Sequence, residues 1–279
     1  MTDSNPSILG ARLARRALLR NSLLAVGAGA VLAACGDRSG STDPGRVGVA
    51  SPLPTLPETG EVTDATWLRT LQSLEHTMLA VYAGLAANGG LPGDAAALAE
   101  PFTAAHTAAA AQLAELVAGA GGDDFACPNP FFNDRYVDPV LASFGETKGT
   151  ADADRDAAQV AYWFEEWAAR SYQAAAARTW DDPDLRVPLI RLAAEASRRV
   201  AGLALAFDDS LVLSPALTGD TVQPDDAGFV VLYAIPSQFG QVGAIELRYG
   251  KPNADGAYAA VSLQTPADNS LLYDSISCT

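Results

Sequence analysis

Residues 74–82 read Leu-Glu-His-Thr-Met-Leu-Ala-Val-Tyr, and residues 164–172 read Phe-Glu-Glu-Trp-Ala-Ala-Arg-Ser-Tyr. In each stretch a glutamate is followed seven residues later by a tyrosine, two turns along one face of a helix. Around the first stretch, apolar residues recur at spacings of three and four, which indicates an amphipathic helix. The repeated pattern predicts two helical hairpins of related design.

Outward from these stretches, residues 63–211 carry helical segments separated by glycine and proline. We expect four long helices, over about residues 64–88, 100–120, 152–178 and 183–208. The connection of residues 121–149 is too long for a turn, and a short helix is expected near residues 138–144. The sequence therefore predicts a mainly α protein, with a crossover joining two helical hairpins in a four-helix bundle.

The glutamates and their partner helices resemble the ferritin-like superfamily, in particular exported ferritin-like domain proteins of bacteria. The likeness covers roughly residues 64–209 and is carried by Leu74-Glu75-His76, Tyr82, His106, Glu165, Tyr172 and Ala194-Glu195-Ala196. It implies a ferritin-like four-helix bundle. It also implies a di-iron site with one glutamate from each of two helices and a Glu-x-x-His pair from each of the others.

Two helices depart from that ligand pattern. Thr103 stands where the second helix would offer a glutamate, and Arg198 stands where the fourth would offer a histidine. The candidate metal ligands that remain are Glu75, His106, Glu165 and Glu195. Because a buried carboxylate needs a metal, a proton or a cation, Arg198 could replace the charge of a metal beside Glu195.

Helical phase separates the candidates. At about 100° per residue, Glu75 and His106 fall near the apolar faces of their helices. Glu165 falls on the alanine side of its helix, and Glu195 lies at roughly 100° from the apolar stripe of its own helix. We therefore expect Glu75 and His106 to lie near each other, Glu195 to lie within reach of Arg198 or another arginine, and no closed di-iron site.

Other polar residues on the two glutamate-bearing helices are expected to have structural roles. Glu166 and Arg170 are four residues apart and are typical of a solvated helix pair. Tyr82 and Tyr172 are expected to be core residues that donate hydrogen bonds to a carboxylate.

Two functions from different classes remain open. The first is a non-enzymatic scaffold or binding module with no cofactor and no catalytic residue. The alternative is a metal-binding protein or oxidoreductase that holds iron or manganese in the incomplete carboxylate and histidine site. The sequence contains no G-x-S-x-G, H-E-x-x-H or P-loop motif, which removes support for common hydrolases and nucleotide enzymes. The protein or small-molecule partner and the oligomeric state stay open.

The N-terminus has the pattern of an export signal over residues 1–34. Arg15 and Arg16 precede a short apolar run, as in twin-arginine signals, and Leu32-Ala33-Ala34-Cys35 resembles a bacterial lipobox. This predicts an extracytoplasmic protein anchored to the cell membrane by a lipid on Cys35. The alternative is an ordinary hydrophobic N-terminal helix. Residues 35–62 are rich in Gly, Ser, Thr and Pro and are expected to form a flexible tether.

Charge and cysteine content exclude other classes. Asp and Glu number 33 against 18 Lys and Arg, a net charge of −15, which argues against nucleic acid as a partner. The chain has two histidines, and its three cysteines have no C-x-x-C spacing, so zinc fingers and zinc hydrolases are not expected. With Cys35 acylated, Cys127 and Cys278 are the two remaining thiols, and an oxidising compartment predicts a disulfide between them.

Residues 212–279 form a segment of a different kind. Strands are expected over Phe229–Ile235, Ala244–Tyr249 and Ala257–Gln264, with residues 250–256 as a hairpin loop. The segment is too small for a core of its own, so we expect a β-rich extension packed on the bundle. A disordered tail is the alternative.

Substitution of Cys35 tests the lipid anchor. We expect Cys35→Ala to release the protein from membranes or to block its processing, because the acyl chains supply the membrane affinity of an acidic protein. Membrane fractionation and N-terminal sequencing measure both effects. A substituted protein that stays in the membrane fraction with an unchanged N-terminus would contradict the prediction.

Overall fold

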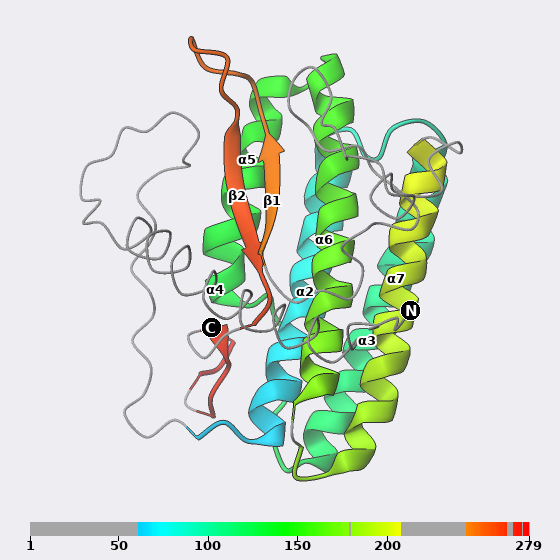
Figure 1. Cartoon of the computed structure of the whole chain (residues 1–279), viewed down its shortest axis with the longest axis vertical. Helices are drawn as coiled ribbons and strands as arrows, with labels where there is room; N and C mark the ends of the chain where they lie inside the picture. Colours follow the sequence, from blue (N-terminus) through cyan, green and yellow to red (C-terminus); the bar gives the residue numbers. More distant parts are fainter. Residues whose placement is uncertain (1–60, 179, 208–243, 267–269, 275, 279) are drawn as a thin grey trace, which may run out of the picture. The chain divides into compact units, whose positions relative to one another are not determined.

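The computed structural model describes residues 61–178, 180–207, 244–266, 270–274 and 276–278. It is mainly helical, with a small antiparallel sheet near the C-terminus (Figure 1). The predicted export signal, with Arg15, Arg16 and Cys35, lies outside the described residues, as does the strand expected over Phe229–Ile235.

Long helices dominate the described chain, and their bounds agree with the sequence predictions to within a few residues. They are α2 (Asp64–Ala87), α3 (Ala99–Gly119), α6 (Ala151–Ala177) and α7 (Arg186–Phe207). The side chain of Thr63 caps α2 by accepting a hydrogen bond from the backbone N–H of Thr66 at 3.2 Å. The helix expected from residue 183 begins instead as the 3₁₀ turn η3 (Pro183–Leu185), in which Asp182 accepts from the N–H of Asp184, and then continues as α7.

Helices α2 and α6 run in opposite directions. Tyr82 on α2 contacts Glu165 on α6, and Tyr172 on α6 contacts Glu75 on α2, so residue numbers rise on one helix as they fall on the other. Because α2 and α3 form a hairpin through the 3₁₀ helix η1 (Gly93–Leu98), α3 runs in the same direction as α6.

The connection from α3 to α6 must therefore travel along the bundle. A helix of this length spans about 30–36 Å, which a short turn cannot cover. The connection contains α4 (Pro130–Phe132), a π-helical turn η2 (Asn133–Val137) and α5 (Asp138–Thr147). The sequence predicted the short helix at α5 but not the turns before it.

Helix α6 lies at the centre of the packing and is buried on almost every side along residues 156–172. Its inner side faces α2 and α7, and the small sheet and α5 cover its outer side (Figure 1). Trp167 illustrates this second layer, because its ring packs on Phe132 and its Nε1 donates to the carbonyl of Gln264 at 2.6 Å.

The sheet consists of β1 (Ala244–Tyr249) and β2 (Ala259–Gln264), paired antiparallel with Ala244 opposite Gln264. The turn after β1 is fixed to the start of α6. Asp156 accepts a hydrogen bond from the N–H of Gly250 at 2.8 Å, and Arg155 donates to the carbonyl of the same residue at 2.9 Å. Gly250 has φ +81°, a conformation that favours glycine.

The C-terminal residues 270–274 and 276–278, called the strap below, return to the bundle and pack on α2. Its residues Leu271, Leu272 and Tyr273 are buried. The strap ends in a disulfide between Cys127 and Cys278, whose Cα atoms are 6.0 Å apart, so the predicted pairing is confirmed.

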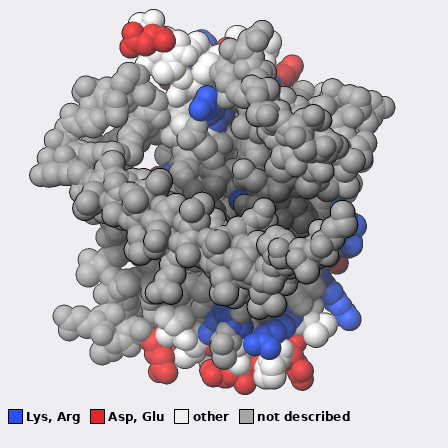
Figure 2. All heavy atoms as spheres, viewed as in Figure 1, with Lys and Arg blue, Asp and Glu red and all other residues white. Residues whose placement is uncertain are grey.

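The described surface carries both charge signs. In Figure 2, acidic and basic side chains lie beside one another along the lower edge of the view. None of the described helices is both long enough and apolar enough to cross a membrane.

Removal of the disulfide should weaken the fold without changing its helices. The bond joins positions 151 residues apart, and closure of such a loop stabilises a folded chain by about 2–5 kcal/mol, chiefly by restricting the unfolded chain. We expect that loss when Cys127→Ser and Cys278→Ser are combined in a Cys35→Ser chain. Urea unfolding against the parent Cys35→Ser chain measures it, with far-UV circular dichroism as the control for helix content. Equal unfolding midpoints would contradict this.

Candidate functional site

A cluster of charged side chains lies inside the bundle, with one contributed by each long helix. Its members are Glu75 from α2, His106 from α3, Glu165 from α6 and Arg199 from α7. Their exposed fractions are 1%, 0%, 0% and 7%. Burial of this kind requires every charge to find a partner within the protein.

Glu75 is held at both carboxylate oxygens. His106 Nδ1 lies 2.6 Å from Oε2, and the hydroxyl of Tyr172 donates to Oε1 at 2.5 Å.

Glu165 has donors from three other helices. The hydroxyl of Tyr82 donates to Oε1 at 2.8 Å, and His106 Nε2 lies 2.9 Å from the same oxygen. Arg199 Nε donates to Oε2 at 2.8 Å. All four oxygens of the two carboxylates thus have a hydrogen-bond donor.

The two tyrosines make the cluster reciprocal. Each glutamate and the tyrosine seven residues after it point to the opposite helix, so Tyr82 binds Glu165 and Tyr172 binds Glu75. Both tyrosines are buried core residues that donate to a carboxylate, as the sequence predicted. The repeated Glu and Tyr spacing therefore places two equivalent pairs across the α2 and α6 interface.

His106 lies between the two carboxylates as an imidazolium. An ionised carboxylate only accepts hydrogen bonds, so both ring nitrogens must donate. Burial by itself lowers the pKa of His106, but Glu165 and Glu75 more than offset burial and raise the pKa to about 9. For Glu165 the signs are reversed. Burial by itself raises the pKa of this carboxyl group, but the positive charges of His106 and Arg199 outweigh burial and lower the pKa below its ordinary value.

The cluster has no net charge. Two carboxylates face two cations, and each contact is a charge-assisted hydrogen bond, the strongest type in proteins. Tyr82 and Tyr172 remain protonated, because burial, followed by the adjacent carboxylates, raises the pKa of both well above the ordinary value.

Two residues of α7 that the sequence predicted for the site lie outside the buried cluster. Glu195 and Arg198 do pair, with 3.8 Å between Oε1 and the guanidinium, but their side chains are 52% and 71% exposed. Glu195 as a buried ligand and Arg198 as the replacement for a metal were therefore wrong. Arg199, and not Arg198, supplies the buried positive charge. Successive residues of a helix point about 100° apart, so a step of one residue takes the side chain from solvent into the core.

Arg199 was not among the residues predicted from the sequence, although the spacing of α7 contains a signal for it. Leu192, Ala196, Arg199 and Leu203 are spaced by four, three and four residues, so Arg199 lies within the apolar stripe of α7. A lone arginine in such a stripe indicates a buried partner of opposite charge.

On α6, the expectations from helical phase also need correction. Glu165 is fully buried, although it lies on the alanine side of its helix. Glu166 and Arg170 form an ion pair of 2.9 Å with exposed fractions of 1% and 2%, so it is not a solvated pair. The prediction of a solvated pair was wrong because α6 has no solvent side along this stretch, whereas Glu165, a candidate ligand from the sequence, does lie inside the bundle.

The cluster does not have the arrangement of a metal centre. The carboxylates bind different nitrogens of one imidazole ring, and none of their oxygens lacks a donor. Thr103, at the vacant ligand position, donates to the carbonyl of Ala99 on its own helix at 2.8 Å. Within the described parts of the chain, no group of three or more His, Cys, Asp or Glu is arranged to hold a metal ion. The donor set therefore does not fit the di-iron site that the resemblance implied.

Comparisons with family models, with curated proteins and with solved structures found no significant match.

Stability should depend on pH through His106. Its pKa is raised from 6.5 in the unfolded chain to about 9 in the folded protein, so folding favours the protonated form. The resulting stabilisation is complete below pH 6.5 and is lost as pH rises to about 9, with a fall in unfolding free energy of up to about 3 kcal/mol. Urea unfolding between pH 5.5 and 9.5 measures this slope.

His76, the other histidine of the chain, supplies a matched control. It is half-buried, and burial lowers its pKa, so its titration favours folding at high pH and has the opposite sign. We expect His106→Gln to abolish the alkaline loss and His76→Gln to preserve it. A slope that survives in His106→Gln would show that another group causes it.

Proposed function

We propose that this protein is an extracytoplasmic lipoprotein whose ferritin-like bundle is a metal-free scaffold or binding module. In this proposal the acylated Cys35 anchors the chain to the cell membrane, and residues 35–62 tether the bundle to it. The Arg15-Arg16 and Leu32-Ala33-Ala34-Cys35 patterns support the export and anchoring steps.

Helix directions support a ferritin-like architecture. The two hairpins, α2 with α3 and α6 with α7, are joined by a connection that runs along the bundle, as in ferritin-like folds with one long crossover. The reciprocal Glu and Tyr pairs relate one hairpin to the other. Together with the sequence resemblance, these observations support our proposal that the bundle is ferritin-like.

The observation that carries the metal-free function is the charge balance of the buried cluster. Arg199 and His106 supply the two positive charges that Glu75 and Glu165 require, and both cations hydrogen-bond directly to carboxylates. A divalent metal would have to displace Arg199 or His106 from oxygens that are already bound. A cluster that is complete in this way holds four helices together and offers no open position for a substrate.

Metal binding is the second candidate function. It is favoured by the meeting of two carboxylates and one imidazole from three helices in one buried cluster. Iron or manganese would suit such ligands, if Arg199 moved away. Glu195 would not contribute, because it lies on the surface.

Metal analysis, together with a pair of adjacent arginine variants, tests the proposal. We expect mature protein from iron- and manganese-supplemented medium to contain well below one metal ion per chain, and EDTA to leave its unfolding midpoint unchanged. Arg199→Met should lower the unfolding free energy by about 3–5 kcal/mol, because it leaves Glu165 short of a cation. Arg198→Met, one residue away on the surface, should change it by less than about 0.5 kcal/mol.

The outcomes separate the two functions. One bound metal ion per chain that is lost in Glu75→Gln would support metal binding and overturn the scaffold proposal. Equal stability of the Arg199 and Arg198 variants would show that the charge balance does not hold the bundle together.

A further inference from the structure

A second polar surface of α2 faces away from the charged cluster. The residues that form it, called the α2 polar face, are all buried and recur once or twice in each turn of the helix: Thr66, Arg69, Thr70, Ser73 and Thr77. A buried row of this kind on a bundle helix needs an external partner. Two chain segments supply it, the strap and the start of the connection after α3.

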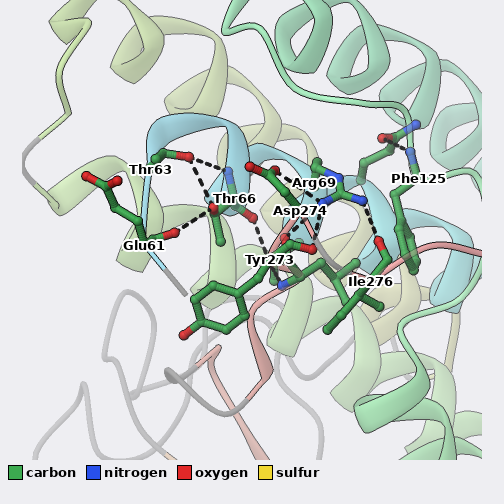
Figure 3. A network of polar contacts seen from close by, with 11 residues as sticks. Glu61, Thr63, Thr66, Arg69, Phe125, Tyr273, Asp274 and Ile276 are labelled. Atoms are coloured by element: carbon green, nitrogen blue, oxygen red, sulfur yellow. Dashed lines mark hydrogen bonds and ion pairs between the residues drawn. The ribbon is translucent and has the colours of Figure 1, made fainter. Parts of the chain in front are cut away.

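Arg69 binds the strap through its main chain. Its guanidinium donates to the carbonyls of Leu272 at 3.3 Å, Tyr273 at 2.8 Å and Ile276 at 2.6 Å (Figure 3). It also lies 3.6 Å from the exposed carboxylate of Asp274. The Arg69 side chain thus binds the strap from Leu272 to Ile276, which lies two residues before Cys278.

The hydroxyl groups of the α2 polar face are oriented by their own helix. Thr70, Ser73 and Thr77 each donate to a carbonyl three or four residues earlier. Their lone pairs are therefore fixed toward the outside, where Thr70 accepts from the N–H of Leu272 at 2.9 Å. The orientation of this acceptor is fixed by contacts within α2 itself, and not by the strap or the disulfide.

The same face also holds the other cysteine. Asn129, two residues after Cys127, donates through its backbone N–H to Thr77 at 3.0 Å and through its side chain to Ser73 at 3.0 Å. Its side-chain amide also lies 3.2 Å from the carbonyl of Ser270, where the strap begins. The two segments that contain Cys127 and Cys278 are thus aligned on one helix face.

We propose that the α2 polar face is a template that docks the strap in the reduced protein and so directs the pairing of Cys127 with Cys278. Arg69 is the positioning residue of this template. Burial of Leu271, Leu272 and Tyr273 adds to the hydrogen bonds, so non-covalent contacts close the strap before oxidation. This goes beyond the scaffold function, because it gives a chain that folds completely while reduced and is locked afterwards.

The chemistry of locking is thiol–disulfide exchange with a small disulfide oxidant. One cysteine thiolate attacks the oxidant and forms a mixed disulfide, with release of one thiol. The second cysteine then displaces the other half of the oxidant. Two protein thiols are oxidised, and the oxidant is reduced to two thiols. Docking accelerates the second step by raising the effective concentration of the second thiol.

Glutathione redox equilibria of the full chain carrying Cys35→Ser test the template. The dithiol and disulfide forms are quantified by alkylation and intact mass over a range of oxidised to reduced glutathione. We expect Arg69→Met to lower the effective concentration of the cysteine pair by at least about tenfold. Thr70→Val is a smaller change and should lower the effective concentration of the cysteine pair several-fold. This variant tests the proposal if the Arg69 variant does not fold.

Arg155→Met is the matched control. Arg155 also hydrogen-bonds to a backbone carbonyl of the C-terminal part, but to that of Gly250, which precedes the start of the strap by 20 residues, so the equilibrium should match that of the parent chain. Hydrogen exchange of the reduced chain supplies a second readout, in which the amide of Leu272 should be protected before oxidation.

Two results would overturn the proposal. One is an equilibrium that Arg69→Met and Thr70→Val leave unchanged. The other is exchange of the Leu272 amide at the rate of an unfolded chain while the cysteines are reduced, which would mean that the disulfide closes the strap.

Discussion

Burial of the Glu165 carboxylate is the constraint on which the rest of the bundle depends. Its oxygens require donors from α2, α3 and α7, and these come from Tyr82, His106 and Arg199. Because an unpaired buried charge costs several kcal/mol, a helix that slides or rotates relative to α6 loses more than packing energy. Apolar side chains can pack in many registers of neighbouring helices, whereas this set of hydrogen bonds forms in a single register. The charged cluster thus selects a single arrangement of helices from those that the apolar stripes permit.

Much of this arrangement was predictable from the sequence, and the rest was hidden for specific reasons. The periodicity of apolar residues predicted the four long helices, and elimination among three cysteines predicted the disulfide. The repeated Glu and Tyr spacing predicted that α2 and α6 are related, but not that each tyrosine reaches the glutamate of the other helix. That contact depends on the antiparallel register of α2 and α6, which is a property of packing and not of either helix alone.

The error about Glu166 and Arg170 came from treating each helix as though one side faced solvent. That assumption holds for α7, where the phase of Glu195 correctly indicated a position off the apolar stripe. It fails for α6, because the sheet and α5 cover the side that a bundle helix would expose. Glu166 and Arg170 are consequently buried together, and the pKa of Glu166 is raised by burial, against the opposing effect of Arg170. A second layer formed by segments far away in the sequence cannot be read from the periodicity of one helix.

Helix α2 connects the two polar systems of the molecule. On one side Glu75 reaches into the charged cluster, and on the other Ser73 and Thr77 hold the segment that contains Cys127. Ser73 and Thr77 each lie two positions from Glu75, so a rotation of α2 that moved Glu75 out of the cluster would also turn the hydroxyls away from Asn129. The charged cluster therefore sets the angle at which the α2 polar face meets the strap, and correct packing of the bundle is a precondition for bringing the two cysteines together.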